Sequence, residues 1–144
     1  MTRRRRALLV AASASYAVGV WWMTLRPAPY DPEIGGVVAA ILEAAASWRP
    51  TSWITFDVVE SASNVVLFVP LGMLVVLWGG RWWQGVLIGL AVSGVIETAQ
   101  LLFLPTRVAD VRDLVANTGG AAIGAIVTAA GLHRNRLRQF TANT

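Results

Sequence analysis

The 144-residue chain contains no cysteine and no lysine, only one histidine, and few charged residues of any kind. Without cysteine, the chain has no disulfide framework, no thiolate nucleophile and no cysteine-based metal site. Charged residues make up 14% of the sequence, whereas an ordinary soluble domain is about 25% charged. Small domains expose the most surface per residue, so these few charges do not cover the surface of a soluble protein of this size. The composition therefore excludes an ordinary soluble domain and indicates an integral membrane protein.

In place of charge, the sequence has long apolar runs. Hydrophobic residues make up 56% of the chain, and the mean hydropathy is +0.57. A helix needs about 20 residues to span a hydrocarbon core of about 30 Å. Four runs predict transmembrane helices at about residues 7–26, 61–79, 82–104 and 113–132. The first run continues well past its small residues, which favours a retained anchor over a cleaved signal peptide. We expect an all-α, polytopic membrane protein with a single domain over residues 1–144.

The placement of the twelve arginines predicts the topology. With both termini in the cytoplasm, eight arginines lie inside and four lie outside, in agreement with the positive-inside rule. All eight acidic residues then fall on the outer side or in the outer half of a helix. We therefore expect a bacterial plasma-membrane protein with an extracytoplasmic loop at residues 27–60. Apolar residues at helical spacing within this loop predict a short amphipathic or re-entrant helix at about residues 34–48.

Polar residues recur at helical spacing in the last three predicted transmembrane helices. A charge at the centre of a membrane helix costs about 2.5–3.5 kcal/mol on insertion scales, so such residues usually face a partner or a wet cavity. In each helix the polar side chains occupy the outer half, and small or apolar residues occupy the inner half. We expect the outer halves to enclose a polar cavity that opens toward the outer leaflet. The predicted ligand-binding residues are Asn64, Glu97, Gln100, Asp113 and Asn117, with Arg107 and Asp110 at the rim.

The inner halves of the same helices are predicted to close tightly. Small residues four positions apart let two helices approach closely. The residues expected at these contacts are Gly72, Gly85, Gly89, Gly120 and Gly124. We expect Gly85 and Gly89 of the third helix to meet Gly120 and Gly124 of the fourth. Pro70 is expected to kink the second helix and to widen the opening of the cavity.

Three segments of the chain resemble motifs of a known family. The run Asn64-Val65-Val66-Leu67-Phe68-Val69-Pro70-Leu71-Gly72 resembles the N-x-x-x-F-x-P-x-G segment of the VanZ-like membrane proteins. The pattern continues as Ser93-x-x-Ile96-Glu97-x-x-Gln100 and ends as Arg107-x-x-Asp110-x-x-Asp113-x-x-x-Asn117-x-x-Gly120-x-x-x-Gly124. The resemblance covers about residues 57 to 124. It implies a relative of a protein that lowers susceptibility to teicoplanin, a lipid-tailed glycopeptide antibiotic that acts at the outer face of the membrane.

The sequence leaves three classes of function open. In the first, the cavity binds or handles an amphiphilic envelope ligand: a membrane lipid, a lipid-linked cell-wall precursor or a lipoglycopeptide. Glycopeptide resistance would follow from that binding. In the second, the protein is an intramembrane enzyme that modifies a lipid-linked precursor, with Glu97 and Asp113 as the candidate catalytic pair. In the third, it is a structural or partner-binding protein, and its glycine faces are suited to a homo-oligomer.

Two further expectations concern cofactors and nucleic acid. We expect no cofactor, although a cluster of carboxylates and amides also suits Ca²⁺ or Mg²⁺, which prefer oxygen ligands. We expect no nucleic-acid binding, because arginines beside membrane helices set orientation and contact anionic lipid headgroups. Asn64 and Asn117 equally fit interhelical hydrogen bonds, which contribute about 0.6 kcal/mol each. The excess of acidic over basic residues near the outer surface favours the ligand-binding class.

Overall fold

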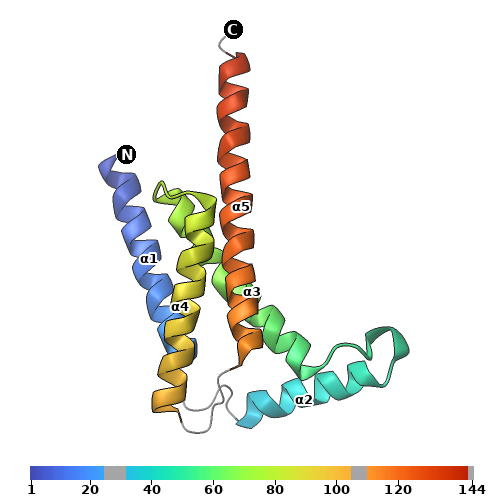
Figure 1. Ribbon diagram of the computed structural model, residues 1–144. Helices are drawn as coiled ribbons and strands as arrows, with labels where there is room; N and C mark the ends of the chain where they lie inside the picture. Colours follow the sequence, from blue (N-terminus) through green and yellow to red (C-terminus); the bar gives the residue numbers. More distant parts are fainter. Residues whose placement is uncertain (25–31, 105–109, 143–144) are drawn as a thin grey trace.

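The computed structural model describes residues 1–24, 32–104 and 110–142 (Figure 1). In these ranges the protein has five α-helices, one 3-10 helix at Arg49–Thr51 and no strands. The α-helices are α1 (Arg3–Thr24), α2 (Pro32–Ala46), α3 (Phe56–Leu77), α4 (Trp82–Phe103) and α5 (Val111–Ala142). Four of them, α1, α3, α4 and α5, are long and apolar enough to cross a membrane. The predicted fold class is therefore confirmed, and α2 is the additional short helix expected between the first two long ones.

The long helices run up and down, so both chain termini lie at one end of the bundle (Figure 1). We call this the terminal end, and the opposite end, where α2 lies across the direction of the long helices, the α2 end. Helices α3, α4 and α5 pack together, and α1 contacts α3. Helix α5 continues past residue 132, where its span was predicted to end, and projects beyond the other helices toward the C-terminus (Figure 1).

Local sequence signals set the ends of α3. Its N-cap residue, Thr55, accepts a hydrogen bond from the backbone N–H of Val58 over 3.4 Å, and Asp57 lies in the first turn. Both features stabilise a helix N-terminus, where backbone N–H groups are otherwise unpaired. At the other end Gly79 has a φ of 99°, which glycine adopts without a side-chain clash. Pro70 lies inside α3, which continues to Leu77, and the kink expected at Pro70 stays a prediction.

Helices α3 and α5 touch through their backbones. A Cβ atom added to Gly120 would collide with the carbonyl of Val65, and one added to Gly124 would collide with the carbonyl of Val69. Gly72 of α3 faces the backbone of α5 in the same way. Small residues four apart thus allow the close approach expected in the inner half of the bundle. This contact fixes the separation of α3 and α5 beside the polar residues described below.

The expected pairing of the glycines between α4 and α5 is wrong. A Cβ atom on Gly85 would lie 2.7 Å from the Cβ of Ala125, and Gly89 faces the Cβ of Ala121. Consecutive residues of a helix point about 100° apart. The two α5 glycines therefore face α3, while the two alanines that follow them, both 0% exposed, face α4. Helix α5 therefore presents small residues on two faces, whereas the spacing of its glycines indicated only one.

Candidate functional site

A small polar cavity lies among α1, α3, α4 and α5, toward the α2 end of the bundle. Its volume is about 120 Å³, several times the roughly 10–15 Å³ that one water molecule needs. The residues around it are Met23, Thr24, Glu60, Ser63, Asn64, Leu67, Ile96, Glu97, Gln100, Asp113 and Asn117. We call this space the polar cavity. It brings together all five residues that were predicted to line such a site.

The first polar contact at the cavity joins α3 to α5. The side-chain Nδ2 of Asn64 donates a hydrogen bond to Oδ1 of Asp113 over 2.7 Å. Asp113 lies in the first turn of α5, where the positive end of the helix dipole stabilises a carboxylate. The side chain of Asn64 therefore bonds to the carboxylate of Asp113, which the N-terminus of α5 already stabilises.

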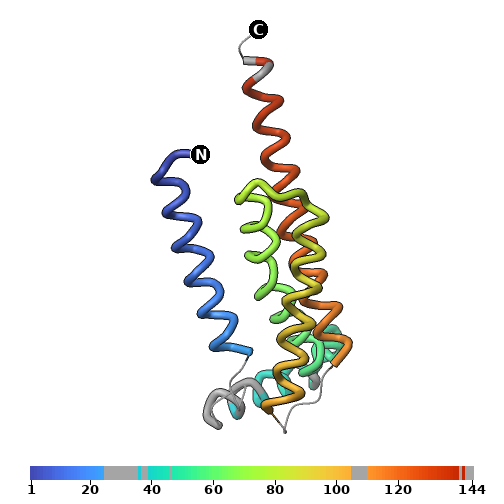
Figure 2. The backbone as a smooth tube through the Cα atoms, turned by 60° about the vertical axis from the view of Figure 1, so that its left-hand side comes forward, coloured from blue at the N-terminus to red at the C-terminus, as the bar shows by residue number. Residues whose placement is uncertain are grey.

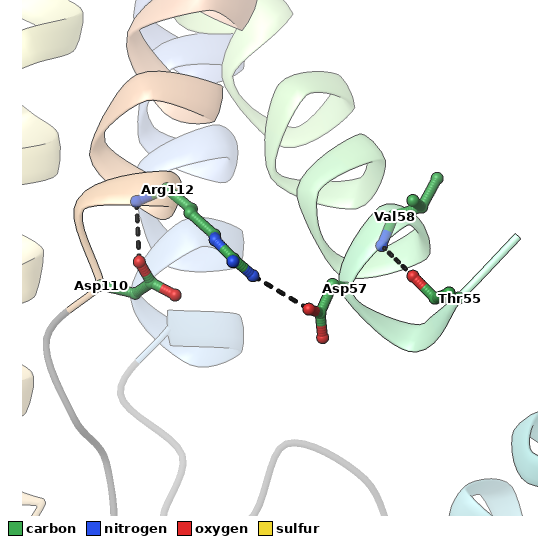
Figure 3. Close-up of polar contacts among 5 residues, drawn as sticks. All are labelled: Thr55, Asp57, Val58, Asp110 and Arg112. Atoms are coloured by element: carbon green, nitrogen blue, oxygen red, sulfur yellow. Dashed lines mark hydrogen bonds and ion pairs between the residues drawn. The ribbon is translucent and has the colours of Figure 1, made fainter. Parts of the chain in front are cut away.

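The second contact joins α4 to the residue that precedes α5. The backbone N–H of Asp110 donates to Oε2 of Glu97 over 3.2 Å. The Oδ1 of Asp110 in turn accepts from the backbone N–H of Arg112 over 2.8 Å (Figure 3). Asp110 thus contacts Glu97, which lines the cavity, and does not line the cavity itself. Its role as a rim residue that binds a ligand stays a prediction. Arg107, the other predicted rim residue, lies outside the described residues.

An exposed ion pair lies near this rim. The guanidinium of Arg112 contacts Oδ2 of Asp57 over 2.9 Å, and the two side chains are 68% and 67% exposed (Figure 3). Neither residue lines the polar cavity. Exposed pairs of this kind typically contribute about 0–1 kcal/mol. The pair connects the first turns of α3 and α5. Its small contribution to stability can be compared with the contributions of the buried hydrogen bonds.

The third contact ties α4 to α1. The side-chain Nε2 of Gln100 donates to the backbone carbonyl of Thr24 over 2.8 Å. Thr24 is the last residue of α1, where helix carbonyls have no partner within the helix. Gln100 therefore satisfies a terminal carbonyl and holds the end of α1 against the cavity.

The fourth contact is the most deeply buried. The Nδ2 of Asn117 donates to Oγ of Ser93 over 2.9 Å, and the two residues are 4% and 0% exposed. The other end of the Asn117 amide, Oδ1, has no hydrogen-bond partner within the described part of the chain. Leaving a buried acceptor unsatisfied costs about 1–3 kcal/mol.

Six residues of the cavity were not predicted to line it: Met23 and Thr24 of α1, Glu60, Ser63 and Leu67 of α3, and Ile96 of α4. Glu60 precedes Asn64 by four positions, so it shares a helical face with it, and this spacing was a usable signal. The α1 residues gave no such signal, because no motif covers α1 and its sequence is apolar on all sides.

No group of three or more His, Asp or Glu side chains in the described ranges is arranged to hold a metal ion. The Ca²⁺ or Mg²⁺ site suggested for the carboxylates therefore stays a prediction. The roles of Glu97 and Asp113 as a catalytic pair stay a prediction as well.

Comparison with known protein families gives a match over most of the chain. A family model described as VanZ/LLP1 matches residues 13–132. No curated protein and no solved structure matches the chain. The matched range contains every residue of the polar cavity. It also covers residues 13–24, about half of α1, where no motif marked the sequence.

Proposed function

The chain belongs to the VanZ/LLP1 family of membrane proteins, and from this membership and the geometry of the polar cavity we propose that it binds the headgroup of a membrane amphiphile. The cavity is proposed to open on the outer leaflet of a bacterial plasma membrane, with both termini in the cytoplasm. Candidate ligands are an envelope lipid, a lipid-linked cell-wall precursor or a lipid-tailed glycopeptide.

The unsatisfied Oδ1 of Asn117 is the observation that carries this proposal. About nine in ten buried polar groups have a hydrogen-bond partner, either in the protein or in ordered water. Asn117 is 4% exposed, lines the polar cavity and pairs only one end of its amide. Because this oxygen is itself buried, a ligand that donates a hydrogen bond would complete the side chain once the amide shifts toward the cavity.

The charge of the cavity indicates the chemistry of the headgroup. Three carboxyl side chains, those of Glu60, Glu97 and Asp113, line the same space of about 120 Å³. Carboxylates accept hydrogen bonds, and charge-assisted bonds are roughly twice as strong as neutral ones. Together with the amide oxygen of Asn117 they favour a headgroup that donates, such as an ammonium, a sugar hydroxyl or an amide. Only a small part of a large headgroup fits this volume.

Reduced susceptibility to teicoplanin is the second part of the proposal. This antibiotic is held at the outer face of the membrane by a lipid tail. A protein that binds amphiphiles in the outer leaflet would compete for the antibiotic or change the lipid that it uses. Family membership and the predicted orientation of the cavity support this part.

Native mass spectrometry tests the headgroup site. The protein is extracted gently from the membranes of the cells that make it, beside the variants Glu97→Gln and Asp57→Asn. We expect wild type and Asp57→Asn to carry one defined lipid, because Asp57 lies outside the cavity, and we expect Glu97→Gln to lose it. The same lipid at the same occupancy in Glu97→Gln would overturn the proposal, and so would a wild-type protein that carries none.

A susceptibility assay tests the second part. Expression in a susceptible host is expected to raise the inhibitory concentration of teicoplanin and to leave that of a glycopeptide without a lipid tail unchanged. Glu97→Gln is expected to abolish the effect. Equal protection against both antibiotics would contradict a mechanism that acts through the lipid tail.

A further inference from the structure

A large apolar groove separates α1 from α4. Its volume is about 860 Å³, within the range of about 300–1,000 Å³ typical of ligand sites. Its walls come from α1, α3 and α4, with residues such as Ala17, Val20, Ala91 and Val95. Figure 2 shows α1 standing apart from the other long helices. We call this space the α1–α4 groove.

The groove adjoins the polar cavity. Thr24 and Ile96 line both spaces. The hydrogen bond from Gln100 to the carbonyl of Thr24 lies at this boundary. A molecule that occupied both spaces would have one end among the carboxylates and amides of the polar cavity and the other end among the apolar side chains of the groove. The lining changes at Thr24. That change of lining matches the boundary between the headgroup and the tail of a lipid.

The end of the groove that lies farthest from the polar cavity is marked by a hydrogen bond. Trp78, the residue that follows α3, donates from Nε1 to Oγ of Ser13 over 3.1 Å, and both residues line the groove. On α4 the lining runs from Gln84 to Ala99, which at about 1.5 Å per residue spans about 22 Å. One leaflet contributes about 15 Å of a hydrocarbon core of about 30 Å. The groove is therefore long enough for an extended tail that crosses a whole leaflet.

We infer that the α1–α4 groove holds the hydrocarbon tail of the lipid whose headgroup enters the polar cavity. This inference rests on the proposed function and adds the position and the chemistry of the tail. The tail enters sideways from the membrane between α1 and α4. Helix α1 covers the tail on one side, and α1 is held at the boundary by Gln100 and near the far end by Trp78.

A second apolar groove lies beside the polar cavity but is shallower. Its volume is about 500 Å³, and it shares Met23, Ser63 and Leu67 with the cavity. Its lining on α3 stops at Leu67, whereas the α1–α4 groove reaches Trp78. Only the α1–α4 groove follows α3 toward the terminal end of the bundle, so we assign the tail to it.

Three tryptophan variants test the assignment by native mass spectrometry of protein from its own membranes. Ala91→Trp fills the α1–α4 groove, and Ala62→Trp fills the second groove. Leu90→Trp places a tryptophan at an exposed α4 residue outside both. We expect Leu90→Trp and Ala62→Trp to carry the wild-type lipid with wild-type chain lengths. We expect Ala91→Trp to lose at least tenfold in occupancy, or to keep the headgroup with shorter chains.

The outcomes separate the two proposals. If wild type carries no defined lipid, the proposed function fails. If wild type carries a lipid and Ala91→Trp carries the same lipid with the same chains, only the tail assignment fails. Loss in Ala62→Trp with retention in Ala91→Trp would also overturn the assignment.

A second measurement avoids the bulk of tryptophan. The chain has no cysteine, so Ala91→Cys and Leu90→Cys each carry one thiol. With native lipid retained, we expect the Ala91→Cys thiol to react more slowly than the Leu90→Cys thiol with a membrane-soluble maleimide. After lipid is removed by detergent exchange, the two rates should become similar. Similar rates in both states would show that no tail occupies the groove.

Discussion

Asn117 of α5 connects the packed part of the bundle to the polar cavity through Ser93 of α4. Its amide Nδ2 donates to Oγ of Ser93 over 2.9 Å, and the residue lines the cavity. Gly89, four positions before Ser93, faces Ala121, four positions after Asn117. Asn117 therefore lies between the polar cavity and the close packing of α4 on α5, and Ser93 is buried behind it. Changes to this pair will affect both stability and ligand retention.

Ser93→Ala is expected to destabilise the protein by about 1 kcal/mol or more. The substitution leaves the buried Nδ2 of Asn117 without its acceptor, and a buried unsatisfied donor costs about 1–3 kcal/mol. The measurement is the free energy of unfolding in detergent. Ser63→Ala is the control, since the exposed Ser63 hydroxyl donates only to its own helix, at the carbonyl of Val59. Equal losses in the two variants would show that the Ser93–Asn117 bond contributes nothing specific.

Gly120→Ala and its neighbour Gly119→Ala are expected to have opposite effects. A Cβ on Gly120 meets the backbone of Val65, whereas a Cβ on Gly119 meets nothing within 4 Å. Alanine is also the better helix former by about 1 kcal/mol. Gly119→Ala should therefore leave thermal stability in detergent unchanged or raised, and Gly120→Ala should lower it by several degrees. A stable Gly120→Ala protein would contradict the backbone contact between α3 and α5.

The Asn64–Asp113 and Asp57–Arg112 pairs are expected to respond differently to salt. In double-mutant cycles with alanine, the first pair should couple by about 0.6–1.7 kcal/mol, the range measured for interhelical hydrogen bonds in a membrane protein. The second pair is more than 60% exposed on both sides and should couple by less than about 1 kcal/mol. Raising the salt concentration should weaken only the exposed pair. Equal salt dependence would place Asn64 and Asp113 in contact with water.

The buried face of α4 was predictable from spacing alone. Gly85, Gly89, Ser93 and Gln100 follow intervals of four and seven positions, and these are the residues of α4 that the structure buries. In a membrane helix whose other residues are apolar, polar residues are costly to expose to lipid, so they face the interior of the bundle. Their spacing therefore indicates the buried face. The same contrast identified Asn64 and Asn117, which reach the polar cavity from α3 and α5.

The position of α1 and the length of α5 were not predictable in the same way. Helix α1 is apolar around its circumference after its first turn, so no residue pattern marks which face meets α3 and which borders a groove. Helix α5 continues to Ala142 through a segment that carries Arg134, Arg136 and Arg138. Hydropathy detects the apolar part of such a helix and not its polar extension. The residue that each glycine contacts on a neighbouring helix depends on how far each helix is rotated about its own axis. The spacing of residues along the sequence does not determine that rotation.

The predicted topology can be tested with single cysteines, because the natural chain has none. Ser47 lies after α2 and Asn135 lies in the extension of α5, and both side chains are exposed. In intact cells a membrane-impermeant maleimide is expected to label Ser47→Cys and not Asn135→Cys. After the membrane is permeabilised, both should react. The reverse pattern would place the polar cavity at the inner leaflet. Headgroup binding would then remain testable as proposed, whereas competition with an antibiotic at the outer face would be ruled out.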